Sequence, residues 1–202
     1  ERVRGEGHDA TLDASRLQSL SCSRAKNLLR WFLRQRGAPM PDHRRLEEML
    51  HQLCSARSDA QICVKWQDWE AHRYQGRVYA QRALGGFDRN LVLPWEGESA
   101  LHWPALERNI FCQRTQGQGI SLEKLQHAPV TLRLRSGGEA LRPHPKSATR
   151  SLKNLLQEHH IPPWQRERLP LLYCGDELVC VMGVAIATDF QALEAEPGIV
   201  LT

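Results

Sequence analysis

The sequence predicts an α+β protein, in which a mainly helical domain precedes a smaller domain of mixed β-sheet or sandwich type with one main helix. Before position 55, apolar residues recur at the three- and four-residue spacing of a helix. In several later segments they alternate with polar residues, as in a half-buried strand. Gly85-Gly86 separates the two patterns, so we expect domains at residues 1–84 and 85–202.

Two helices are expected in the first domain. The first can be capped by Ser21 or Ser23 and ends at Gly37, and the second can be capped by Asp42. Segments 62–66 and 71–80 resemble short strands with a turn near Gly76. The apolar faces of the two helices are Ala25, Leu28, Leu29 and Phe32 in the first, and Leu46, Met49, Leu50 and Leu53 in the second.

The clearest strand of the second domain covers residues 130–135. Its apolar residues share one face, and Thr131, Arg133 and Arg135 share the other, which predicts one buried face and one basic, solvent-exposed face. Gly137-Gly138 suits a tight hairpin turn, whose return strand would bring Arg142 to the same surface. Further expectations are strands at 91–93, 101–103 and 110–113, a helix burying Leu152, Leu155 and Leu156, and an apolar hairpin over 171–187.

The positive charge of the chain is concentrated in two segments. The formal net charge is only +4, but segment 22–46 has seven basic residues and one acidic residue. Segment 129–170 has eight basic and three acidic residues. Two separated basic surfaces suit an extended polyanion better than a small acidic ligand. Ordinary solvated helix and strand faces remain the alternative.

Several classes of protein are disfavoured. No apolar run approaches the roughly 20 residues that span a bilayer, and the charged first residues lack a signal peptide's apolar region. The six cysteines form no C-x-x-C pair and the nine histidines are scattered. We therefore expect a cytoplasmic protein with reduced thiols, no membrane partner and no metal site. Because the chain begins with Glu1 rather than Met, we also expect it to be part of a longer protein.

One segment invites comparison with a nucleotide-binding motif. Ser136-Gly137-Gly138 begins like the S-G-G-x-D-S loop of one class of ATP-using enzymes, but Glu139-Ala140-Leu141 follows, so the aspartate and second serine are missing. A phosphate loop also needs a strand leading into a helix N-terminus. The sequence therefore favours a hairpin here. No other nucleotide or nucleophile motif is present, so no reaction follows from the residues themselves.

Two groups of segments resemble one known family. Residues 135–139, Arg142-Pro143, 150–156 and 161–173 together resemble the C-terminal domain of tRNA(Ile)-lysidine synthetases. Upstream, residues 29–33, 37–41 and 72–74 resemble the helical middle domain of that family, which recognises the substrate. The two matches cover most of the chain.

The resemblance implies a function and its cofactors. Family enzymes are ligases that join lysine to the wobble cytidine of the minor isoleucine tRNA with a CAU anticodon, using ATP with Mg. The S-G-G-x-D-S loop belongs to their N-terminal catalytic domain. Because that motif is missing here, this chain alone is expected to bind tRNA, to hold no cofactor and to have no catalytic activity. The last domain is also similar to a module of the phenylalanyl-tRNA synthetase β-subunit. That protein is therefore the alternative to a tRNA(Ile)-lysidine synthetase as the longer protein to which this chain belongs.

The expected tRNA-binding residues are the arginines and lysines of the two basic segments. Guanidinium groups can clamp phosphates, and lysines act as mobile charges. In the second domain, where the resemblance implies contact with the acceptor stem, they are Arg133, Arg135, Arg142, Lys146, Arg150, Lys153, Arg166 and Arg168. In the first domain, expected near the anticodon arm, they are Arg24, Lys26, Arg30, Arg34, Arg44 and Arg45.

Further points concern aromatic residues, oligomeric state and rival functions. Trp31, among apolar neighbours, is expected in the core or a domain interface rather than under a base, whereas Trp164 either packs a helix end or stacks on RNA. The resemblance leaves open whether the protein forms a homodimer, although no stripe of residues in the sequence identifies a dimer interface.

Two alternatives from other functional classes remain: a basic module that binds an acidic protein, and a cysteine-dependent enzyme. The latter requires one unusually reactive thiol.

Overall fold

The computed structural model describes residues 11–55 and 62–202. The chain divides between Leu84 and Gly85 into two compact units, called here the first and the second unit. Both contain helices and antiparallel strands, so the α+β class is confirmed. The second unit is the longer of the two, contrary to the expectation of a smaller domain. Among the described residues, no helix combines the length and the apolar character needed to cross a bilayer.

Side-chain caps start two helices of the first unit, whereas Ser21 at the start of the remaining helix makes no side-chain cap hydrogen bond. The Asp13 carboxylate accepts a hydrogen bond from Ser15 N at 2.9 Å, and the Asp42 carboxylate accepts one from Arg45 N at 2.7 Å. The predicted cap at Asp42 is thus confirmed, and it satisfies a helix amide that has no partner within the helix. The predicted faces around Leu29 and Leu50 are buried. The helices are α1 (Ala14–Ser19), α2 (Cys22–Gln35) and α3 (His43–Ser55).

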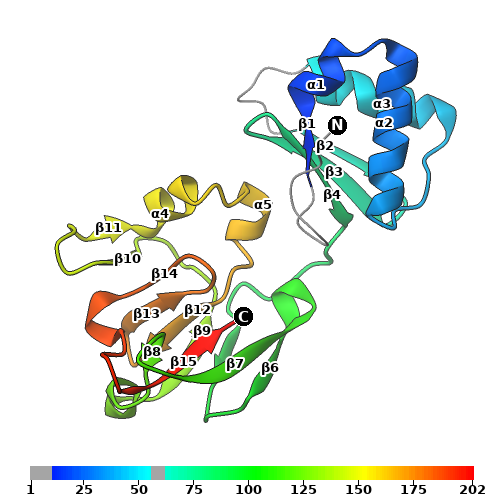
Figure 1. The fold of residues 1–202 in the computed structure, drawn as a ribbon. Helices are drawn as coiled ribbons and strands as arrows, with labels where there is room; N and C mark the ends of the chain where they lie inside the picture. The colour runs from blue at the N-terminus through cyan, green and yellow to red at the C-terminus, as the bar shows by residue number, and fades with distance from the viewer. Residues whose placement is uncertain (1–10, 56–61) are drawn as a thin grey trace. The chain divides into compact units, whose positions relative to one another are not determined.

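A four-stranded antiparallel sheet completes the first unit beside its three helices. Its order is β1-β4-β3-β2, and the helices pack on one of its faces around a single apolar core (Figure 1). Arg73 lies on this inner side, and its Nη1 donates to Leu53 O at 2.8 Å, which satisfies a carbonyl at the end of α3. The strands are β1 (Leu12–Asp13), β2 (Ile62–Trp66), β3 (Trp69–Tyr74) and β4 (Arg77–Arg82).

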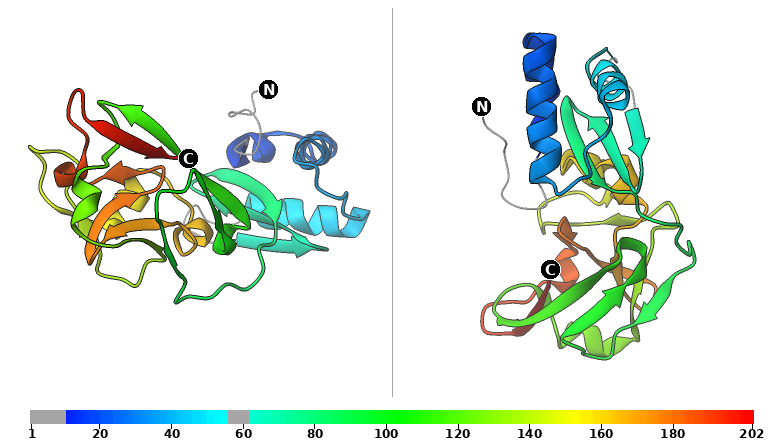
Figure 2. Two further views of the ribbon diagram at one scale, coloured as in Figure 1. Left: turned by 90° about the horizontal axis from the view of Figure 1, so that it is seen from below. Right: turned by 90° about the vertical axis from the view of Figure 1, so that its right-hand side faces the viewer.

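The second unit contains two larger antiparallel sheets and a two-stranded ribbon (Figure 2). The five-stranded sheet has the order β14-β13-β12-β9-β5, the four-stranded sheet β6-β7-β15-β8, and the ribbon β10-β11. The strands are β5 (Val92–Pro94), β6 (Ala100–Trp103), β7 (Arg108–Gln116), β8 (Ile120–Ser121), β9 (Val130–Arg133), β10 (Ala140–Leu141), β11 (Arg150–Ser151), β12 (Leu171–Cys174), β13 (Glu177–Val181), β14 (Ala185–Ile186) and β15 (Pro197–Leu201). The helices are α4 (Leu152–Glu158) and α5 (Pro163–Arg166), with 3₁₀ turns η2 (Pro104–Leu106), η3 (Lys124–His127) and η4 (Thr188–Phe190).

Two apolar clusters make the second unit layered. In one cluster, Leu132 and Leu172 of the five-stranded sheet pack with Ile110 and Ile199 of the four-stranded sheet. In the other, Leu171, Tyr173 and Val181 pack with the buried leucines of α4. The five-stranded sheet is therefore covered on both sides, and the Arg133 face of β9 is not the open surface that alternation alone suggested.

The predicted hairpin at Gly137-Gly138 is wrong. β10 pairs with β11 rather than with β9, and residues 134–139 form a loop. The physical reason is a side chain: Glu139 Oε1 accepts hydrogen bonds from the backbone N–H groups of Ser136 and Gly137, so a carboxylate closes the turn instead of strand pairing. The hairpin about Gly175-Asp176 is confirmed, since β12 pairs with β13.

Candidate nucleic-acid interface

The outer face of α2 in the first unit combines cations with an exposed aromatic ring. Arg24, Asn27, Trp31 and Arg34 are all exposed, and their spacing places them on the side of the helix opposite its buried residues. Trp31 is 46% exposed, so of the two places expected for it, the core is excluded and a domain interface stays a prediction. Sequence reasoning missed it because its immediate neighbours are apolar. The spacing did indicate its exposure: Trp31 follows Arg24 by seven residues, so the two side chains lie on the same face of α2.

The cations of the first basic segment form two groups: engaged cations bind another residue of the chain, and available cations do not. Lys26 Nζ forms an ion pair with Glu47, and Arg30 Nη1 donates to Asn27 Oδ1 at 3.2 Å. Arg45 donates to Glu48 Oε2 at 2.8 Å and to the carbonyl of Lys65, so it links α3 to β2. Arg24, Arg34 and Arg44 are exposed and form neither an ion pair nor a side-chain hydrogen bond with another described residue.

Arg133 in the second unit is held by its own domain. Its Nε donates to Thr131 Oγ1 at 2.8 Å and its Nη2 to Gly175 O at 2.7 Å. Nη1 lies 3.6 Å from an exposed carboxylate oxygen of Asp176, and the guanidinium covers the ring of Tyr173. Its side chain is 30% exposed. These contacts make Arg133 part of the scaffold around the β12–β13 turn.

Four other predicted arginines also have intramolecular partners. Arg142 Nη2 donates to Asp189 Oδ1 at 2.9 Å, and Arg150 forms an ion pair with Glu158. Arg166 Nε donates to Ile161 O at 2.7 Å. Arg168 donates to the carbonyls of Ala105 and Gly85 and stacks over Phe87, with its guanidinium carbon 4.3 Å from the ring centre. Arg166 and Arg168 thus tie loops together and are only partly exposed.

Lys146 and Lys153 are the most available predicted cations of the second unit. Both are exposed, and no ion pair or hydrogen bond joins either side chain to another part of the described chain. Lys153 lies in the first turn of α4, whose cap is Ser151, and Lys146 lies in the loop between β10 and β11. Arg135 is half-buried beside the turn that Glu139 closes. The structure therefore does not bring the eight predicted residues together as one equivalent set.

The turn at residues 136–139 already contains an anion. Glu139 Oε1 accepts from Gly137 N at 2.8 Å, in the manner of a phosphate in a backbone nest. Burial acts to raise the pKa of Glu139, but the backbone N–H donors of Gly137 and Ser136 and the charge of Arg135 outweigh it and lower that pKa. The carboxylate therefore occupies the amides that a nucleotide loop would offer.

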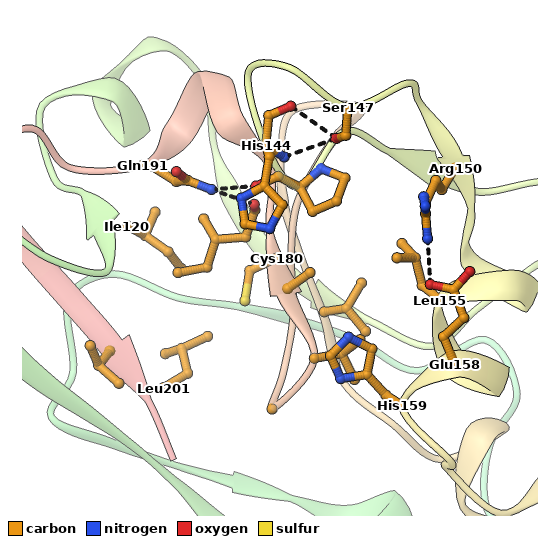
Figure 3. A pocket seen from close by; sticks show the side chains of 17 residues that line it. Ile120, His144, Ser147, Arg150, Leu155, Glu158, His159, Cys180, Gln191 and Leu201 are labelled. Carbon is orange, nitrogen blue, oxygen red and sulfur yellow. Dashed lines mark hydrogen bonds and ion pairs between the residues drawn. The ribbon is translucent and has the colours of Figure 1, made fainter.

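A cavity of about 550 Å³ lies beside the second basic segment (Figure 3). Its wall is mostly apolar, with Ile120, Cys180 and Leu201 among its residues. Two of its polar side chains bind other residues of the unit: Arg150 pairs with Glu158, and Gln191 Nε2 donates to the carbonyls of Pro143 and Ile186. The cavity presents no convergent set of available cations, so we do not assign the polyanion to it.

Burial acts against activation of four of the thiols. Burial raises the pKa of Cys180 to about 12, and burial also raises the pKa of Cys54, Cys63 and Cys112. A nucleophilic cysteine requires the opposite shift. None of these four cysteines has the electrostatics of a catalytic nucleophile.

Two family models match the regions that carry the two basic surfaces. The model described as "TilS substrate binding domain" matches residues 12–79, and that described as "TilS substrate C-terminal domain" matches residues 130–202. The first match contains α2 and α3, and the second contains Lys146 and Lys153.

Three known proteins with similar sequences carry the same name. The tRNA(Ile)-lysidine synthase of Coxiella burnetii is 32% identical over 94% of this chain and 42% of its own length. Those of Nitrosomonas europaea and Azoarcus sp. are 36% and 37% identical, over 92% and 94% of this chain and 40% of each relative. The chain thus spans about two fifths of the length of these relatives. A crystal structure of a TilS C-terminal domain aligns with a TM-score of 0.44 and 20% identity, covering 55% of this chain and 95% of that one.

Proposed function

The chain belongs to the TilS family, whose substrate-binding and C-terminal domains it carries, and on this premise we propose that it binds tRNA. The main observation behind the proposal is that each of the two matched regions contains exposed cations that no described residue neutralises. Such cations can bind the phosphate backbone of RNA, because neutralising the phosphates releases the counterions bound to them.

The proposed interface has two parts. In the first unit it is the outer face of α2, where Arg24 and Arg34 flank Trp31, together with Arg44 at the start of α3. An exposed indole between cations can stack on an unpaired base, as single-stranded RNA requires. In the second unit it is Lys146 and Lys153, which suit the phosphates of an A-form stem. The engaged arginines, Arg133 and Arg168 above all, shape the surface.

The wider proposal concerns the enzyme to which these domains belong. We infer that the substrate is the isoleucine tRNA with the CAU anticodon and that the ligase reaction uses ATP, Mg and lysine in a part of the enzyme that this chain does not contain. A cytoplasmic location follows from that role. The two family matches favour this parent over the phenylalanyl-tRNA synthetase β-subunit.

Two alternatives from other classes make different predictions. A basic module for an acidic protein would bind heparin as well as tRNA. A cysteine-dependent enzyme requires one thiol that reacts with iodoacetamide much faster than the others at neutral pH. The raised pKa values of Cys63 and Cys180 argue against it, and mass spectrometry of the alkylated peptides would decide.

Binding of the purified chain to two tRNAs tests the proposal. The isoleucine tRNA with the CAU anticodon and elongator methionine tRNA are titrated at two salt concentrations, with heparin as competitor. Each phosphate contact should lower log affinity by roughly 0.7 to 0.9 per tenfold rise in salt. Salt-sensitive binding that prefers the isoleucine tRNA supports recognition by these domains. Equal binding of both tRNAs would mean that these domains bind RNA without specificity. Absence of binding contradicts the proposal.

A further inference from the structure

Three potential metal ligands gather on the outer face of the first unit's sheet. Cys63 of β2 and His72 of β3 are directly opposite each other in the antiparallel register. Glu70 precedes His72 by two positions, so it points to the same face of β3. This face is opposite the one that carries Val64 and Ala71, which belong to the apolar core beneath the helices.

The donor atoms of these side chains converge. His72 Nε2 lies 3.0 Å from Glu70 Oε1 and 4.0 Å from Cys63 Sγ. The nearest donor atoms of the three residues all lie within 4.8 Å of one another. Ligands of one tetrahedral ion, with bonds of about 2.0 to 2.3 Å, lie roughly 3.3 to 3.8 Å apart, so binding requires the Cys63 side chain to move slightly closer to His72.

The geometry does not suit a nucleophilic relay. In such a relay, one imidazole nitrogen faces the thiol while the other is held by the carboxylate. Here the same nitrogen, Nε2, faces both Cys63 and Glu70. Burial and the charge of Glu70 also raise the pKa of the Cys63 thiol, which is the wrong direction for a nucleophile.

We propose that Cys63, Glu70 and His72 form a binding site for a divalent transition-metal ion, with Zn²⁺ as the ion that best fits the donors. A sulfur, an imidazole nitrogen and a carboxylate oxygen form a set that zinc accepts, whereas Mg²⁺ and Ca²⁺ prefer oxygen alone. Thiolate and carboxylate together balance the charge of the ion. Three protein ligands leave the fourth tetrahedral position to water.

The surroundings support the carboxylate ligand. Gln81 of β4 donates from Nε2 to Glu70 Oε1 at 3.0 Å, and Gln81 is the register partner of Glu70. A hydrogen bond of this kind orients a metal-binding carboxylate. When the ion binds, the Cys63 thiol loses its proton to solvent, and His72 must present Nε2 unprotonated, with the ring proton on Nδ1.

Sequence reasoning predicted no metal site, and the hairpin explains why. The spacing from Cys63 to Glu70 and His72 matches no zinc motif. The three residues become neighbours only once β2 and β3 pair with Cys63 opposite His72. A register shift by one residue would send Cys63 to the other face of the sheet.

Cobalt titration of the full purified chain tests the site, because Co²⁺ bound to a thiolate gives a charge-transfer band in the near ultraviolet. We expect a saturable band with one ion per chain, displaced by Zn²⁺ and not by excess Mg²⁺. Cys63→Ser should abolish the band. Cys22→Ser, at another exposed cysteine, should retain it. Absence of a band in the unaltered chain, or a band that survives Cys63→Ser, overturns the proposal.

A second variant avoids the risk that changing buried His72 disrupts folding. Gln81→Ala leaves all three ligands in place and should weaken zinc affinity by roughly 10- to 100-fold, because the carboxylate loses its orienting donor. Zinc should raise the unfolding temperature of the unaltered chain and leave that of Cys63→Ser unchanged. Equal zinc affinity in the unaltered chain, Cys63→Ser and Gln81→Ala would place the ion elsewhere.

Discussion

The guanidinium carbon of Arg133 lies 4.7 Å from the centre of the Tyr173 ring, on the α4 side of the five-stranded sheet. Strand alternation placed Arg133 among the expected RNA-binding residues, because its apolar neighbours on β9 point to the other face. In the structure, the N–H groups of Arg133 instead donate hydrogen bonds to Thr131 Oγ1 and Gly175 O. A charge on a strand face can therefore be part of the fold even when the sequence pattern assigns it to solvent.

Arg133→Gln should lower the stability of the second unit. The change removes the contact with Tyr173 and the donor to Gly175 O, so we expect a loss of roughly 1 to 3 kcal/mol in the free energy of unfolding. Hydrogen exchange of the backbone amides in β9 and β12 measures this within the second unit. Lys153→Gln is the control and should change stability by no more than about 0.5 kcal/mol. Unchanged exchange in Arg133→Gln would contradict the scaffold role.

Replacement of both available lysines should reduce the salt dependence of tRNA binding. Lys146→Gln with Lys153→Gln removes two potential phosphate contacts, so the slope of log affinity against log salt should fall by about two. Arg114→Gln with Arg108→Gln removes two exposed charges of β7 outside both basic segments and should leave the slope nearly unchanged. Equal effects in the two double variants would mean that only net charge matters.

Trp31→Ala should weaken tRNA binding without unfolding the first unit. Stacking of one base on an aromatic ring contributes about 1 to 3 kcal/mol, and the ring is 46% exposed. Trp31→Phe should retain most of the affinity, because a π-face remains. Phe111→Ala, which removes a 54% exposed ring of the second unit, is the control and should have little effect. If Trp31→Ala and Phe111→Ala bind tRNA alike, Trp31 does not stack on a base.

Sequence periodicity predicted what depends on local spacing. The buried faces of α2, α3 and α4 and the β12–β13 hairpin follow from apolar spacing and turn residues within a short window. The cap at Asp42 is equally local. These features formed as predicted because each needs only its near neighbours.

Partners that are distant in sequence could not be predicted. Arg168 donates to Ala105 O and Gly85 O, which lie 63 and 83 positions away, so nothing near Arg168 indicates that it is engaged. β10 pairs with β11, nine or more positions away, directly after the loop that the Glu139 carboxylate closes. The candidate interface follows the same division: its basic segments were visible, but which cations remain available depends on tertiary contacts.

Gly198→Ala should strongly destabilise the second unit. A Cβ at this position would lie 2.2 Å from the carbonyl oxygen of Gln118, because β15 passes close to the loop after β7. The backbone must move to admit it, which predicts a loss of several kcal/mol, on the order of 3. Gly86→Ala, with no heavy atom within 4 Å of the added carbon, should change stability by less than about 1 kcal/mol. Thermal unfolding of the two variants measures the difference, and equal midpoints would show that β15 tolerates the added carbon.

Glu139→Gln should destabilise the second unit at neutral pH and lose that effect in acid. Burial alone would raise the pKa of Glu139, but the backbone donors of Gly137 and Ser136 and the charge of Arg135 lower it below its ordinary value of 4.5. A lowered pKa in the folded state means that ionised Glu139 stabilises the fold above the unfolded pKa. This stabilisation is lost as the pH falls through the lower, folded pKa.

The measurement is the free energy of unfolding of both proteins from neutral pH down to below pH 4.5, the ordinary Glu value. The gap between the unaltered chain and Glu139→Gln should be constant well above that value and should narrow below it. Glu123→Gln controls for the loss of one exposed carboxylate outside the turn. A gap that widens on acidification would mean that protonated Glu139 is the form held by Gly137 N, and that the turn is not closed by an anion.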